Sequence, residues 1–171
     1  MSSKQIFLSL GSNIGDRQTH LRNALSALES GGVRIVKCSS LYETEPQQLK
    51  EQPWFLNIAV EGETPLFPMQ LLHLLLRIEH EEGRKRGPDS LPKGPRTLDI
   101  DILLYSNVII DTPRLTIPHP RLTERRFVLE PLVEIAPQLR HPVEKESLKK
   151  ALSRVSQQQL RNLGAWRDDA L

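Results

Sequence analysis

The chain has a single cysteine, few aromatic residues and no long apolar run. One cysteine, Cys38, excludes an internal disulfide and a zinc site built on cysteines. No apolar run approaches the ~20 residues that cross a bilayer, and the N-terminus lacks the pattern of a cleaved leader. Basic residues (23) nearly balance acidic ones (21), so the net charge of +2 does not demand a nucleic-acid partner. We therefore expect a cytoplasmic monomer with no membrane or nucleic-acid partner.

The length and composition are those of one globular domain over residues 1–171, with 155–171 expected to be a less ordered tail. Two helices are predicted by apolar residues at offsets 0, 3, 4 and 7. One begins after Asp16 and ends at Gly31, and the other runs from Pro68 to Gly83. Their apolar faces are Leu21, Ala24, Leu25 and Leu28, and Leu71, Leu74, Leu75 and Ile78. Further helical segments are predicted at Phe127–Ile135 and around Leu148–Val155.

Strand-like segments lie before, between and after these helices. A short strand, Val108–Ile110, follows a two-residue connection and is expected to form a hairpin with the strand before it. The order strand, helix, strand, strand, helix, strand matches the β-α-β-β-α-β plan of ferredoxin-like folds. We therefore predict an α+β fold with a ferredoxin-like core and C-terminal helical and strand additions. The main strands are predicted at Lys4–Leu10, Val33–Tyr42, Phe55–Val60 and Thr97–Tyr105.

Two acids in the last of these strands are the central chemical feature. Side chains alternate along a strand, so Asp99 and Asp101 share one side, with Cα atoms about 6.6 Å apart. The opposite side is apolar and consists of Leu98, Ile100, Ile102 and Leu104. Carboxylates this close favour a bound cation, and Mg²⁺ takes one or two carboxylates together with substrate phosphates. The alternative is the polar face of a half-exposed strand, although aspartate is a poor strand residue.

Basic segments flank the acid pair. The loop from Gly83 to Arg96 contains Arg84, Lys85, Arg86 and Lys93 and is rich in glycine and proline. Beside the acid pair, these features predict a lid over a metal-bound polyphosphate; a solvated basic loop or a nucleic-acid patch is the alternative. A second basic cluster holds His119, Arg121, Arg125, Arg126 and Phe127, with a surface turn before a helix as its alternative. We interpret Gly11–Asp16 mainly as a tight turn and helix cap, because it lacks the phosphate-loop spacing.

Four segments together resemble the 6-hydroxymethyl-7,8-dihydropterin pyrophosphokinase family. They are Leu10–Asn13, Gln52–Asn57, Gly94–Asp101 and Ile117–Phe127, in the family's order, and the similarity extends to about Pro137. The stretch Gly-Pro-Arg-Thr-Leu-Asp-Ile-Asp is the most specific. The resemblance implies ATP-dependent transfer of pyrophosphate to the pterin hydroxymethyl group in folate biosynthesis, giving AMP and the pterin diphosphate.

The resemblance also implies roles for individual residues. Asp99 and Asp101 would hold two Mg²⁺ ions, and Arg84 and Arg86 would be loop arginines that assist transfer. Nucleotide contacts are implied for Arg96, Ile102, His119 and Arg125. Pterin contacts are implied for Thr44, Phe55, Asn57 and Phe127.

The chain departs from the family pattern at three places, and two other functions stay open. Pro92-Lys93 stands where Arg-Trp is usual, Glu45 where a Pro-Pro pair often begins, and Pro120 in place of an occasional Tyr. A nucleic-acid-binding module of ferredoxin-like shape is one alternative. A nucleotidyltransferase or small-molecule kinase with another acceptor is the other.

Overall fold

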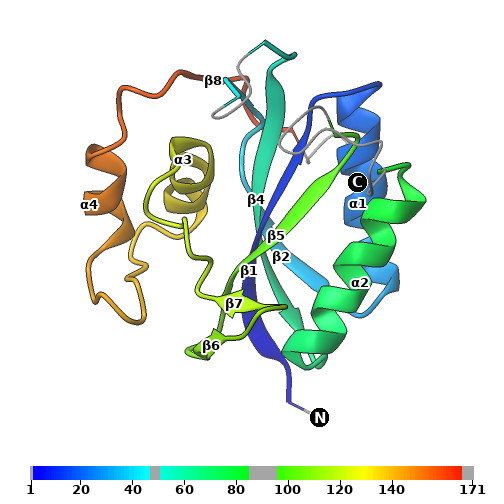
Figure 1. Ribbon diagram of the computed structural model, residues 1–171, viewed down its shortest axis with the longest axis vertical. Coiled ribbons are helices and arrows are strands. Elements are labelled where there is room, and N and C mark those ends of the chain that lie inside the picture. Colours follow the sequence, from blue (N-terminus) through cyan, green and yellow to red (C-terminus); the bar gives the residue numbers. More distant parts are fainter. Residues whose placement is uncertain (1, 47–50, 85–95, 167–171) are drawn as a thin grey trace.

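The computed structural model describes residues 2–46, 51–84 and 96–166. A central antiparallel sheet separates two layers of helices (Figure 1). Helices α1 (Arg17–Ser30) and α2 (Pro68–Glu81) cover one face of the sheet. Helix α3 (Arg126–Ile135) covers the other face, and α4 (Leu148–Ser153) packs against α3. The expected ferredoxin-like core is confirmed, and its two faces have separate apolar cores.

The sheet has the strand order β5-β1-β4-β3-β8, and β2 also pairs with β4. Long strand β4 lies beside β1, and its two halves pair with β3 and with β2. This places the end of β1 and the starts of β4 and β5 at the same end of the sheet. The strands are β1 (Lys4–Ser12), β2 (Arg34–Cys38), β3 (Tyr42–Thr44), β4 (Phe55–Thr64), β5 (Asp99–Tyr105) and β8 (Leu160–Asn162).

Both predicted amphipathic helices are confirmed. Asp16 is the N-cap of α1, and its carboxylate accepts a hydrogen bond from Thr19 N at 3.1 Å. Pro68 occupies the first position of α2, where its missing N–H costs nothing. All eight residues of the two predicted apolar faces are buried, which secures both helices against the same face of the sheet.

The predicted strand Val33–Tyr42 is wrong as a single unit. Strands β2 and β3 are separate, and Ser39 lies between them. The Ser39 hydroxyl accepts a hydrogen bond from Ala59 N at 2.9 Å, in place of a main-chain carbonyl. The ladder along β4 is interrupted there because a side chain has replaced a backbone acceptor.

The predicted hairpin of Val108–Ile110 with the preceding strand is also wrong. Strand β6 (Ile110–Asp111) pairs with β7 (Thr116–Ile117) in a separate two-stranded sheet. The chain leaves β5 through a turn closed by the hydrogen bond from Val108 N to Tyr105 O at 3.0 Å. Ser106 has a positive φ of 46° in this turn, which directs the chain away from β5.

Leu104 does not lie on the predicted apolar side of β5. The pairing of β1 with β5 shifts between Phe7 and Leu8, so Leu8 is opposite Ile102 and Phe7 is opposite Leu104. Leu103 is the extra residue, and Leu104 consequently packs with Phe7 in the core under α3.

The expected less ordered tail contains regular structure. Strand β8 lies within it, and Trp166 is buried in the core beneath α1 and α2. Residues 167–171 lie outside the described residues.

Candidate active site

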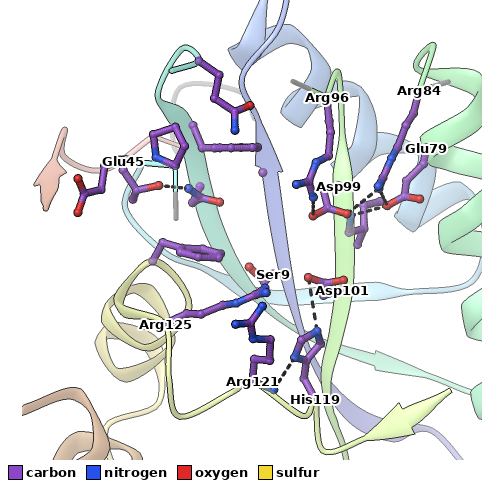
Figure 2. Close-up of a pocket in the computed structure, with 18 of the residues that line it drawn as sticks. Ser9, Glu45, Glu79, Arg84, Arg96, Asp99, Asp101, His119, Arg121 and Arg125 are labelled. Atoms are coloured by element: carbon purple, nitrogen blue, oxygen red, sulfur yellow. Dashed lines mark hydrogen bonds and ion pairs between the residues drawn. The ribbon is translucent and has the colours of Figure 1, made fainter. Parts of the chain in front are cut away.

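A cavity of about 480 Å³ opens where β1 ends and β4 and β5 begin, beside α2 and α3 (Figure 2). The sequence segments that line it are far apart along the chain. Of the twelve predicted site residues, ten lie on its wall: Thr44, Phe55, Asn57, Arg84, Arg96, Asp99, Asp101, His119, Arg125 and Phe127.

The other two predicted site residues are Ile102 and Arg86. The side chain of Ile102 is buried in the core with Ile100, and Ile102 is not among the described residues that line the cavity. Its nucleotide contact stays a prediction. Arg86 lies outside the described residues, as does most of the predicted lid between Gly83 and Arg96.

The acid pair faces the cavity as the alternation along β5 predicts. Asp99 lies opposite Gly11 on β1, and Asp101 lies opposite Ser9. Ile100 between them is buried in the core. Because Gly11 and Ser9 are small, the carboxylates have open space above the neighbouring strand.

Asp99 is held by two arginines. Its Oδ1 is 2.6 Å from Arg84 Nη1, and its Oδ2 is 2.9 Å from Arg96 Nη1. The same Arg84 nitrogen contacts Glu79 Oε2 at 3.0 Å. Figure 2 shows these four side chains converging on one side of the cavity. Arginine therefore supplies the positive charge around Asp99.

Glu79 is a buried carboxylate that the sequence reasoning missed. It is 2% exposed, and its Oε2 accepts a hydrogen bond from Ile100 N at 2.7 Å. This bond links α2 directly to β5 between the two acids. A signal was present, because Glu79 lies four residues after Leu75 on the apolar face of α2, where an acid is out of place.

Asp101 has a different environment. Its Oδ2 is 3.8 Å from His119 Nε2, and Arg125 approaches from α3 (Figure 2). Burial, and then repulsion by Asp99, raises the pKa of Asp101 to about 7. Burial also lowers the pKa of the Arg125 guanidinium. Asp101 is therefore a costly place for negative charge unless a cation joins it.

His119 is oriented by the chain that follows it. Its Nδ1 lies 3.1 Å from Arg121 N, and the backbone N–H donates to the ring. This assigns the proton of the neutral imidazole to Nε2, which points toward Asp101. His119 thus presents a donor to the cavity. Arg121, whose role the sequence left open, also lines the wall.

The opposite end of the cavity combines amide, hydroxyl and aromatic groups. Asn57 Nδ2 donates to Thr44 Oγ1 at 2.5 Å, and both residues are buried. Phe55 and Phe127 line the same region, with Arg96 and Arg125 guanidinium carbons 5.6 and 5.4 Å from the respective ring centres. This end suits a flat ring with a polar edge.

The donor set fits magnesium. Within residues 2–46, 51–84 and 96–166, no group of three or more histidine, cysteine or carboxylate side chains is arranged to hold a metal. Asp99 and Asp101 offer two hard oxygen ligands from one strand at the cavity wall, beside the arginine and histidine side chains that can bind phosphate. Mg²⁺ binds in this way, through one or two carboxylates and substrate phosphates.

Comparison with known proteins gives related sequences and folds. The 7,8-dihydro-6-hydroxymethylpterin-pyrophosphokinase (HPPK) family model matches residues 7–137. The 2-amino-4-hydroxy-6-hydroxymethyldihydropteridine pyrophosphokinase of Bacillus subtilis (strain 168) is 49% identical over 142 residues, covering 82% of this chain and 81% of that protein. The corresponding protein of Aquifex aeolicus (strain VF5) is 40% identical over 144 residues, covering 84% and 88%.

Longer proteins contain a similar region. The mitochondrial folate synthesis bifunctional protein of Arabidopsis thaliana is 47% identical over 131 residues, which cover 77% of this chain but 23% of that protein. Among solved structures, an HPPK-DHPS protein in complex with substrates superposes with a TM-score of 0.73 at 16% identity. It covers 90% of this chain and 43% of that one, and the likeness supports the fold.

The family match includes the acid pair, the flanking arginines and His119, and the relatives from Bacillus subtilis and Aquifex aeolicus are matched over most of their length. The chain therefore belongs to the 7,8-dihydro-6-hydroxymethylpterin-pyrophosphokinase family.

Proposed function

We propose that this chain transfers a pyrophosphoryl group from ATP to the hydroxymethyl group of 6-hydroxymethyl-7,8-dihydropterin, as a step of folate biosynthesis. One observation carries the proposal. A single cavity joins an acid pair ringed by arginine and histidine to an amide, a hydroxyl and two phenylalanine rings. The first half suits a metal-bound triphosphate, and the second suits a pterin.

The nucleotide occupies the half of the cavity around β5. Asp99 and Asp101 would hold two Mg²⁺ ions, which would neutralise phosphate charge. Arg96, His119 and Arg125 donate to phosphate oxygens, since each presents N–H groups at this wall. Arg84 leaves Asp99 and contacts the transferring phosphates instead, because the Asp99 carboxylate and the phosphates are both anions that can pair with its guanidinium group.

The pterin occupies the other half. Phe55 and Phe127 offer π faces to the heterocycle, and Asn57 and Thr44 offer donors and acceptors to its edge. The buried Asn57–Thr44 hydrogen bond holds both groups in place before the ligand arrives. This arrangement directs the hydroxymethyl group toward the acid pair.

In the reaction, the substrate hydroxyl oxygen bonds to the β-phosphorus of ATP, and the hydroxyl proton is released to solvent. The bond from that phosphorus to the oxygen bridging the α-phosphorus breaks, and AMP leaves. Displacement at phosphorus depends mainly on positioning and charge neutralisation, so no protein nucleophile is required. The chain's arginines supply that neutralisation from the cavity wall, and His119 donates a hydrogen bond there.

Product analysis tests the function directly. The protein is incubated with ATP, Mg²⁺ and the pterin, and the products are separated by ion-exchange chromatography. We expect AMP and the pterin diphosphate in equal amounts. ADP would indicate an ordinary kinase, and free pyrophosphate would indicate a nucleotidyltransferase.

We expect the protein to act as a cytoplasmic monomer. Across the described ranges, the helices are too short or too polar to cross a membrane. The alternative of a nucleic-acid-binding module is disfavoured, because two carboxylates on β5 face the basic cavity and would repel a phosphate backbone. Size-exclusion chromatography with light scattering would test the monomeric state.

A further inference from the structure

The segment 156–166, which we name the C-terminal strap, follows the part of the chain matched by the family. It passes three elements that carry residues of the pterin half of the cavity: α3 with Phe127, β3 with Thr44, and the start of β4 with Phe55. We propose that the C-terminal strap is a positioning element for the pterin half of the cavity. The inference rests on the proposed function, because it assigns that half to the pterin.

The strap caps the helix that carries Phe127. Arg125 is the N-cap residue of α3 and makes no capping side-chain hydrogen bond within the described part of the chain. Gln158 supplies one instead, because its Oε1 accepts from Arg126 N at 2.8 Å. Its Nε2 donates to Glu124 O at 3.0 Å. Unpaired N–H groups at a helix start are costly, so Gln158 helps to determine where α3 begins.

The Arg126 side chain strengthens this connection. Its Nη1 donates to the carbonyl oxygens of Ser156 at 2.9 Å and Gln158 at 2.8 Å. Its Nε bonds Glu130 one turn along α3 at 3.1 Å. Arg126 stands directly between Arg125 and Phe127, which both line the cavity. A shift of the strap would therefore move the first turn of α3.

The middle of the strap extends the sheet beside the cavity. Strand β8 pairs with β3, with Leu160 opposite Thr44. Gln159 N donates to the Glu45 carboxylate at 3.1 Å, and Glu45 N donates to Gln159 O at 3.3 Å. Thr44 and Glu45 both line the cavity, and Figure 2 shows Glu45 at the end away from Asp99. The strap thus stiffens the chain around Thr44.

The far end of the strap is anchored in the core. The guanidinium group of Arg161 lies 5.0 Å from the centre of the Trp54 ring, next to Phe55 in the chain. Trp166 is 6% exposed, and its Nε1 donates to Gln18 Oε1 on α1 at 3.0 Å. With both ends held, the strap joins the elements of the pterin half to one another.

The test compares the binding of each ligand in the full-length protein and its Gln158→Ala variant. Binding of 6-hydroxymethylpterin is followed by its fluorescence, and binding of Mg²⁺ with α,β-methylene-ATP by calorimetry. We expect the Kd for the pterin to rise about fivefold, within the range that the loss of a helix cap covers. The Kd for the nucleotide analogue should rise less, by about twofold, because Arg125 is its one assigned contact at the start of α3, whereas its contacts on β5 are kept.

Two further variants separate positioning from general loosening. Gln158→Glu keeps an oxygen acceptor for Arg126 N and should restore most of the pterin affinity. Arg154→Ala removes only the surface pair with Glu146, just before the strap, and should leave both affinities unchanged.

Several results would overturn the role of the strap. One is an unchanged pterin Kd in Gln158→Ala, with or without a lower melting temperature, and another is equal weakening of both ligands. Failure of Gln158→Glu to recover affinity would count against the cap in the same way. If the wild-type protein itself does not bind the pterin, the proposed function fails, and the role of the strap fails with it.

Discussion

Asp99 and Asp101 are two residues apart on β5 but have different electrostatic surroundings. Asp99 contacts two guanidinium groups, whereas the Asp101 carboxylate faces the Nε2–H of His119 at 3.8 Å. A cation that enters the site therefore relieves the charge of Asp101 and competes with arginine at Asp99. At the residue scale, this asymmetry leads to two predictions.

The first concerns the dependence of stability on pH. The folded pKa of Asp101, about 7, is above its usual value of 3.8, so between these values the folded protein binds more protons than the unfolded chain. This group's contribution therefore favours folding at low pH and is lost as the pH rises toward 7. Asp101→Asn should remove that dependence and make the metal-free protein more stable at about pH 8, with little change near pH 4.

Urea unfolding of both proteins at these pH values measures the difference. Glu124→Gln is a suitable control, since Glu124 is an exposed acid near the cavity. A gain in stability that is equal at both pH values would contradict the raised pKa.

The second prediction concerns Arg84. The side chain contacts Glu79 and Asp99 and reaches the transferring phosphates in the proposed complex. Arg84→Ala should therefore lower kcat by about 10²-fold, the scale expected when one transition-state charge partner is lost. The Kd for the pterin should change by less than about threefold. Steady-state kinetics and pterin titration give the two values, and equal losses in both would refute the role.

At the scale of elements, two contacts determine how the cavity walls meet. Glu79 connects α2 to β5 through Ile100 N, and Gly11 allows β1 and β4 to come together beside Asn57. Neither residue needs to touch a substrate to affect the site.

Removing the buried Glu79 carboxylate should destabilise the fold. In Glu79→Ala, Ile100 N loses its acceptor, and Arg84 keeps its contact with Asp99. We expect a loss near the lower end of ~3–5 kcal/mol in the free energy of unfolding. Glu81→Ala on the exposed side of α2 removes a 3.6 Å surface pair and should cost less than about 0.5 kcal/mol. Urea denaturation compares them, and similar losses would show that Glu79 has no special role.

Gly11→Ala should disturb the pterin half. A Cβ at this position would lie 2.6 Å from Asn57 Oδ1, so the amide must move away from its place beside Thr44. We expect the pterin Kd to rise about tenfold, equivalent to about 1.4 kcal/mol. Fluorescence titration measures the Kd. An unchanged Kd would mean that Asn57 does not need its observed position.

Sequence periodicity predicted correctly those elements in which the spacing of apolar residues reflects only which side chains are buried. Helices α1 and α2 follow from their apolar stripes, and the acid pair follows from alternation along β5. The break between β2 and β3 depends on the Ser39 hydroxyl, and the displaced Leu104 depends on an extra residue in one strand. Both are side-chain or register details that a local pattern does not contain.

At the scale of the whole molecule, the cavity is assembled from segments that are distant in sequence. Its predicted members were found through motifs that resemble one family, and ten of the twelve line the cavity. Glu79 was missed because a single acid on an apolar stripe suggests no partner until β5 is placed beside it. The C-terminal strap was missed because its contacts are made by main-chain groups, Gln158 and Trp166, without a motif.

The most direct test of the central claim is magnesium-dependent binding of α,β-methylene-ATP, measured by calorimetry for the wild-type protein, Asp99→Asn and Asp101→Asn. We expect tight binding by the wild-type protein that requires Mg²⁺, and a loss of at least about 10²-fold in either folded variant. Binding of the same strength in the variants, still dependent on Mg²⁺, would contradict the account.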